Sequence, residues 1–244
     1  MPPGSRAILF IMSAKKGKPL PPCPDPDKYI LVNSNEGPHW RKKRGTVTTA
    51  RLNTVFEKNV DNSKVASPAA KRIVQKLRPF IQELNTGRLT AKLAGALIKA
   101  INEYGEPDFF FLNGFEFQFP PLGKVLYKQV TVRQNADEIV ISIPIDPCTM
   151  APMNKLVTDY YFEAVLLYGD VRKENGLRID SVISPLYPIK NTIETTCELS
   201  LQLPATPFPW MILLKASCQE KNRPSIHYDN YGMRVVMVGG GNAN

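Results

Sequence analysis

The sequence predicts an α+β protein in which a small N-terminal helical unit precedes an antiparallel β-sandwich. Apolar residues recur at steps of three and four up to Gly105, and runs typical of strands follow from Pro107 onward. The charge changes at the same place: residues 1–100 carry 19 Lys and Arg against 6 Asp and Glu, whereas residues 101–244 carry 12 against 16. The net charge of +9 therefore comes entirely from the front of the chain.

The composition indicates a globular protein. A chain of 244 residues can bury a hydrophobic core without metals or disulfides. Its 43% hydrophobic and 22% charged residues are unlike those of disordered, collagen-like or coiled-coil proteins. Four cysteines without regular spacing are typical of free thiols in a reducing compartment, so we expect a cytoplasmic protein.

Residues 1–45 are predicted to form an extended basic arm, because proline, glycine and polar residues dominate there. Only residues 29–32 resemble a strand. The apolar run at residues 7–12 is too short for a secretion signal, and Met12 is an alternative start. No run approaches the roughly 18 apolar residues of a membrane span, so no membrane partner is expected.

Residues 46–106 are predicted to form the helical unit. Ser67 and Pro68 are a typical cap and first residue of a helix, and Pro79 should kink or split that helix near Arg78. A second apolar stripe begins at Leu89 and ends near Gly105. A less regular helix is expected over residues 51–60.

Residues 107–238 are predicted to form the sandwich, and residues 239–244 a flexible tail. The clearest strand covers residues 192–203, where apolar and polar residues alternate as in a strand with one solvated face. Several short strands without intervening helices favour antiparallel sheets, similar to immunoglobulin-like domains in strand number only. The other expected strands cover residues 125–132, 138–145, 160–168, 177–183, 210–218 and 233–238.

Catalysis has little support in the sequence. The two histidines, His39 and His227, have no recognisable nucleophile motif beside them. Closely spaced zinc ligands are missing, and the glycines at 239–241 precede no helix. We therefore predict no enzyme, no cofactor and no metal; an enzyme whose site is invisible in the sequence is the third-ranked hypothesis.

The basic front part is the feature of the sequence that indicates a function. Four cations directly follow a tryptophan that could stack on a base, and more lie on the expected helices. The leading hypothesis is a non-catalytic binding or assembly protein that engages an acidic partner; the alternative is sequence-tolerant nucleic-acid binding. Self-association, a purely solvated surface and docking of the helices on the acidic back part also remain open. The candidate binding residues are Trp40, Arg41, Lys42, Lys43, Arg44, Lys71, Arg72, Lys76, Arg88 and Lys92.

The chain also resembles an uncharacterised family of bacterial proteins, mostly from the Bacteroidetes group, over roughly residues 35–105. The resemblance implies a basic helical front, a strand-rich back and a bacterial cytoplasm, and it brings no function or site residue with it. It is carried by Gly37, His39, Arg41, Arg44 and Gly45, by residues 50–53 and by residues 68–74.

Overall fold

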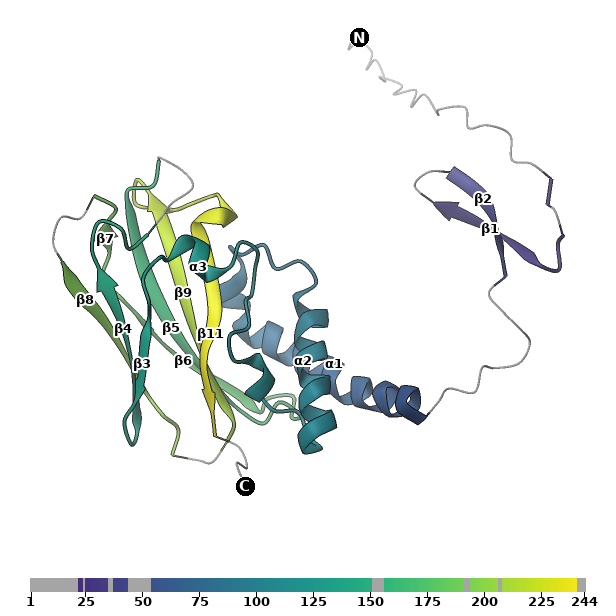
Figure 1. The fold of residues 1–244 in the computed structure, drawn as a ribbon, viewed down its shortest axis with the longest axis horizontal. Helices are drawn as coiled ribbons and strands as arrows, with labels where there is room; N and C mark the ends of the chain where they lie inside the picture. The colour runs from purple at the N-terminus through teal and green to yellow at the C-terminus, as the bar shows by residue number, and fades with distance from the viewer. Residues whose placement is uncertain are drawn as a thin grey trace, which may run out of the picture. The chain divides into compact units, whose positions relative to one another are not determined.

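The computed structural model describes residues 22–23, 25–34, 37–43, 54–150, 156–190, 194–205 and 208–240. It divides into two compact units, Met1–Leu52 and Asn53–Asn244, which are described one at a time (Figure 1). In the first unit, β1 (Tyr29–Ser34) pairs with β2 (Gly37–Lys42) as an antiparallel hairpin. The strand expected at residues 29–32 is present, and it has a partner strand that the sequence did not suggest.

The second unit begins with a long helix, α1 (Thr54–Ile81), which corrects the expected helix start at Ser67. Pro68 lies inside this helix and removes only one backbone hydrogen bond, while Ala66, Ala69 and Ala70 around it are completely buried. Burial of that alanine stripe holds the helix together through the proline. The split that was one of the two outcomes predicted near Arg78 does not occur, since α1 continues to Ile81 with Pro79 inside it; the kink stays a prediction.

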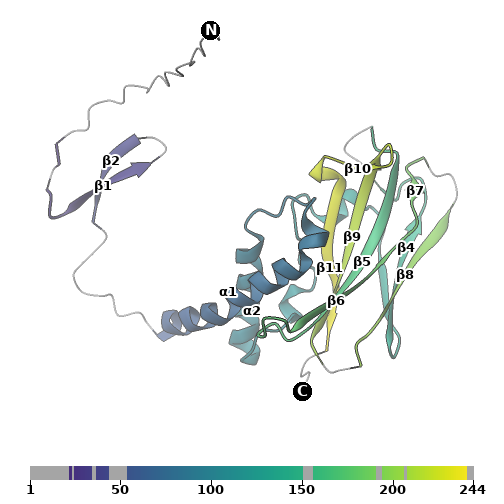
Figure 2. The same cartoon turned by 180° about the vertical axis from the view of Figure 1, so that it is seen from behind.

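The second helix, α2 (Leu89–Tyr104), agrees with its prediction. Gly105 ends it with a φ of 81°, and its amide donates to the Ile101 carbonyl oxygen at 2.9 Å. Glycine adopts this left-handed conformation without steric cost, which explains the stop. Helices α1 and α2 pack against each other beside the sheets (Figure 2).

The described strands of this unit form two antiparallel sheets, so the α+β fold is confirmed. The larger sheet has the order β11–β9–β5–β6, with β10 beside β9 and β7 beside β5; the smaller has the order β3–β4–β8. The larger sheet consists of β5 (Asp159–Gly169), β6 (Leu177–Ile183), β7 (Tyr187–Pro188), β9 (Trp210–Glu220), β10 (Arg223–Pro224) and β11 (Tyr231–Gly239). The smaller consists of β3 (Thr131–Gln134), β4 (Glu138–Ile145) and β8 (Thr195–Gln202).

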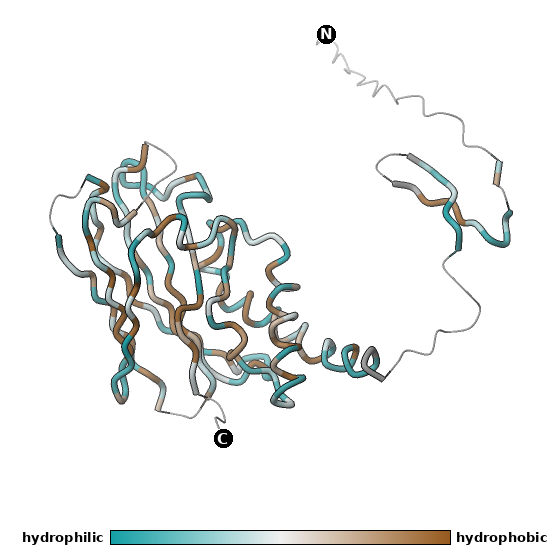
Figure 3. Tube along the Cα trace, in the orientation of Figure 1, coloured by the Kyte–Doolittle hydropathy of each residue, from teal (hydrophilic) through white to brown (hydrophobic). Residues whose placement is uncertain are grey.

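The larger sheet is covered on both faces and forms the middle of three layers. Along β9, Met211 and Leu213 belong to the core shared with α1 and α2, whereas Ile212 and Leu214 belong to the core shared with the smaller sheet. Alternate side chains of one strand thus fill two cores. The helices therefore share a core with the sheet, which the sequence left open. Figure 3 shows hydrophobic residues concentrated in these strands.

The strand expected at residues 125–132 begins later than predicted, since only Thr131 and Val132 of it lie in β3 and Val125 ends a short helix. Residues 122–125 form the short helix α3 (Leu122–Val125), and β3 begins only at Thr131. Pro121 precedes the helix in an extended conformation, and the Leu122 amide donates to Glu116 Oε2 at 3.0 Å. A carboxylate at a helix start satisfies an amide that has no partner within the helix, which favours the turn over a strand. Two 3₁₀ turns, η1 (Phe110–Leu112) and η2 (Tyr228–Asn230), complete the unit.

Candidate anion-binding surface on the helical hairpin

The α1–α2 hairpin concentrates positive charge. Residues 62–100 contain eight Lys and Arg and a single acidic residue, Glu83. Apolar residues such as Ile73 and Leu77 point into the core, so the cations between them are left at the outside. Seven of the eight are exposed, and Lys64 among them pairs with Asp61. We call five of the other exposed cations the basic helical surface: Lys71, Lys76, Arg78, Arg88 and Lys92.

The one carboxylate of this stretch is already engaged. Glu83 Oε2 lies 3.0 Å from Lys215 Nζ, which reaches it from the middle of β9. The Lys215 side chain is only 3% exposed, and its ammonium also lies 5.9 Å from the centre of the Tyr231 ring. Glu83 therefore neutralises a buried charge of the sheet and none of the cations around it.

The cations of the basic helical surface have no such partners. In the part of the chain that the structure describes, none of the five takes part in an ion pair or a hydrogen bond through its side chain. Arg72 differs, because it is half-buried and its Nη1 donates to the Val171 carbonyl oxygen at 3.2 Å. Since the helices dock on the sheet through apolar side chains, the five exposed cations do not serve that docking.

A groove runs along this surface between α1 and the start of α2, with a volume of about 460 Å³. Among the residues that the structure describes, its charged lining consists of Lys71 and Arg78 and includes no acidic residue. Its aliphatic lining is formed by Val74, Ile81 and Leu84, and its neutral polar lining by Gln75, Gln82, Thr86 and Thr90. A smaller hollow of about 360 Å³ shares Gln75 and is lined by Arg72, Lys76, Glu174, Asn175 and Leu177.

The tryptophan and its adjacent cations lie on the β-hairpin of the first unit. Trp40 pairs with Leu31 and Lys42 with Tyr29, so these four residues share one face, while Arg41 pairs with Ile30 on the other. Strand geometry thus separates Arg41 from the indole face and leaves Lys42 on it. Arg44 lies outside the described residues. Ile30 and Leu31 are 41% and 49% exposed, which leaves apolar surface on both faces of the hairpin.

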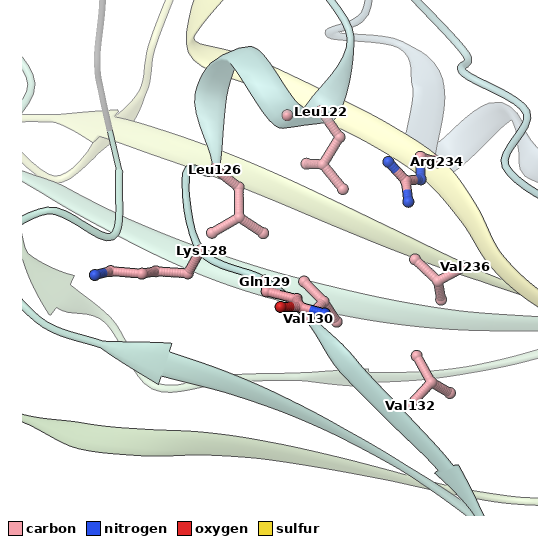
Figure 4. A pocket seen from close by; sticks show the side chains of 9 residues that line it. Leu122, Leu126, Lys128, Gln129, Val130, Val132, Arg234 and Val236 are labelled. Carbon is pink, nitrogen blue, oxygen red and sulfur yellow. The ribbon is translucent and has the colours of Figure 1, made fainter.

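A further cavity, of about 290 Å³, opens between the edge strands β3 and β11 (Figure 4). Its lining combines Leu122, Leu126 and three valines with polar side chains; Arg234 lies beside Leu122, and the Lys128 side chain extends away. Both cations have carboxylate partners: Arg234 Nη1 lies 3.7 Å from Glu116 Oε1, and Lys128 Nζ pairs with Asp146. This cavity therefore carries no net positive charge to recruit an anion.

The pKa values of the two carboxylates in these ion pairs are shifted in opposite directions. Burial raises the pKa of Glu116, although the Leu122 amide and Arg234 oppose that effect. The hydrogen bond from Lys128 lowers the pKa of Asp146. Both carboxylates thus contact neighbouring residues of the chain, and neither is free to act as a general acid or base at the cavity.

The remaining reactive residues are dispersed or buried. Within the residues described, no group of three or more His, Cys, Asp or Glu is arranged to hold a metal ion. Burial raises the pKa of the Cys218 thiol to about 12 and also raises that of Cys197, so neither thiol is poised as a nucleophile. His39 and His227 belong to different units. None of the described helices is both long enough and apolar enough to cross a membrane.

Comparison with protein-family models finds no match to the chain, and comparison with curated proteins finds none either. Function has to be inferred from the charge and geometry described above.

Proposed function

We propose that this chain is a non-catalytic binding protein that holds an acidic partner on its basic helical surface. One observation carries the proposal: residues 62–100 have eight cations and one acid, and that acid is paired with the buried Lys215. Uncompensated charge gathered on one surface attracts partners of opposite sign and accelerates their association. The groove beside Lys71 and Arg78 adds a concave contact area to that charge.

A direct binding measurement tests the proposal. Fluorescence anisotropy of a labelled acidic peptide should report binding by the full chain, and replacing all five cations of the basic helical surface by glutamine should abolish it. Single- and double-stranded DNA and RNA of equal charge are measured in parallel. An acidic peptide that does not bind, or that binds the glutamine variant equally well, contradicts the proposal. Tighter binding of nucleic acid than of the peptide favours the alternative function.

A further inference from the structure

The groove between α1 and α2 has a composition that narrows the class of acidic partner. Its charged residues, Lys71 and Arg78, are seven positions apart on α1, so they lie on the same side of the helix, about 10 Å apart along its axis. Between them lies Val74, half-buried, with Ile81 and Leu84 adding aliphatic surface. Two positive ends therefore flank an apolar centre.

None of the described residues that line this groove is aromatic. Sequence-tolerant binding of single-stranded nucleic acid relies on bases stacking on aromatic side chains, and each stacked base adds about 1–3 kcal/mol. Aliphatic side chains instead pack well against other aliphatic side chains. The groove lining consequently suits an apolar amino-acid side chain better than a nucleobase.

We infer that the groove is the anchor site for an acidic peptide segment that carries one aliphatic residue between two acidic residues. In an extended chain every second side chain points to the same face and each residue advances about 3.3 Å, so carboxylates four positions apart, with the aliphatic residue midway, share one face and span about 13 Å, which the long side chains of Lys71 and Arg78 can reach. The aliphatic residue falls between them and faces Val74. Gln75, Gln82, Thr86 and Thr90 supply donors and acceptors for the peptide backbone along the same groove. This inference rests on the proposed function, because it names the kind of acidic partner.

Two labelled peptides test the inference with the full chain. Both carry two aspartates four positions apart, and they differ only in leucine or serine midway between them. Because the open groove buries only part of the leucine, we expect about tenfold tighter binding of the leucine peptide. Equal affinities for the two peptides overturn the inference while leaving the proposed function standing, since both remain acidic. If neither peptide binds, both the inference and the proposed function are contradicted.

A protein variant tests whether the preference for the leucine peptide arises at Val74. Val74→Thr keeps the shape of the side chain and makes the groove lining polar, so it should reduce the preference for leucine over serine to about twofold. Val65→Thr is the matched control, since Val65 is exposed on the same helix outside the groove, and it should keep the full preference. A preference that survives Val74→Thr unchanged contradicts the placement. Single-stranded DNA of the same charge that binds as tightly as the leucine peptide overturns the choice of a peptide.

Discussion

Three cations in and beside the sheets differ from the cations of the basic helical surface in their partners. Lys128, Lys215 and Arg234 each lie within 4 Å of a carboxylate, whereas Lys71 and Arg78 have no carboxylate beside them in the described structure. Lys128, Lys215 and Arg234 are therefore engaged in ion pairs within the folded chain. Lys71 and Arg78 instead carry like charges that repel one another, and both can pair with an anion of another molecule. Stability and binding should therefore respond to different substitutions.

The largest effect is expected where the sheet meets the helices. Glu83→Ala leaves the buried Lys215 without its carboxylate and should lower the free energy of unfolding by about 3 kcal/mol, a moderate value because the Glu83 side chain is 28% exposed. Urea unfolding measures this loss. Asp61→Ala is the control, since it removes an ion pair with Lys64 in which both side chains are 71% exposed, and it should change little. Equal effects of the two substitutions contradict a structural role for Glu83.

Charge reversal on the helices should affect binding and spare stability. Lys71→Glu combined with Arg78→Glu places two carboxylates at the groove and should weaken acidic-peptide binding by about thirtyfold or more, since like charges repel at both ends. Anisotropy measures the affinity, and urea unfolding checks the fold.

Lys124→Glu combined with Arg133→Glu makes the same change in net charge at exposed cations of α3 and β3. This control should retain most of the affinity. If it loses as much as the groove variant, binding follows net charge and not the groove.

A smaller effect is expected at the cavity between β3 and β11. Glu116→Gln weakens the contacts with Arg234 and with the Leu122 amide and should cost about 1 kcal/mol of stability. Thermal or urea unfolding detects the change. Acidic-peptide affinity should stay within twofold of the wild type, because Arg234 lies outside the basic helical surface. A marked gain in affinity would show that the newly freed Arg234 also recruits acidic partners.

The smallest effect concerns acid pH. Lys128 lowers the pKa of Asp146 in the folded state, so the carboxylate stabilises the fold above its ordinary pKa of about 3.9. That contribution is lost as the pH falls through the lower folded-state pKa. Asp146→Asn should be less stable than the wild type at neutral pH and approach it in strong acid. A stability difference that stays constant across the acid range contradicts the assignment.

The fold class and several strands could be predicted from the sequence because apolar and polar residues alternate along those strands. In β8, Cys197, Leu199 and Leu201 are buried and the residues between them are exposed, as expected. The long helix could not be predicted in this way, since Ser67 and Pro68 are typical of a helix start and only tertiary burial of the neighbouring alanines carries the helix past them. Local preference is a weak guide where packing opposes it.

The candidate site was predicted in part. Positive charge on the expected helices pointed to Lys71, Lys76, Arg88 and Lys92, all of which are exposed on the hairpin. The groove itself was missed, because Gln82, Thr86 and Thr90 are ordinary polar residues until the loop brings them beside α1. The buried Lys215 was missed as well. It lies between Leu214 and Ala216 in an apolar run, and a charged residue at such a position is the available signal for an internal ion pair.

The salt dependence of acidic-peptide binding tests the central claim most directly. If uncompensated cations of the helices hold the partner, the association constant should fall about tenfold or more between about 50 mM and about 200 mM NaCl, because salt screens exposed charges. In the variant with all five cations replaced by glutamine, that dependence should nearly vanish. An affinity that is insensitive to salt, or equally sensitive in both proteins, would contradict the assignment of the basic helical surface.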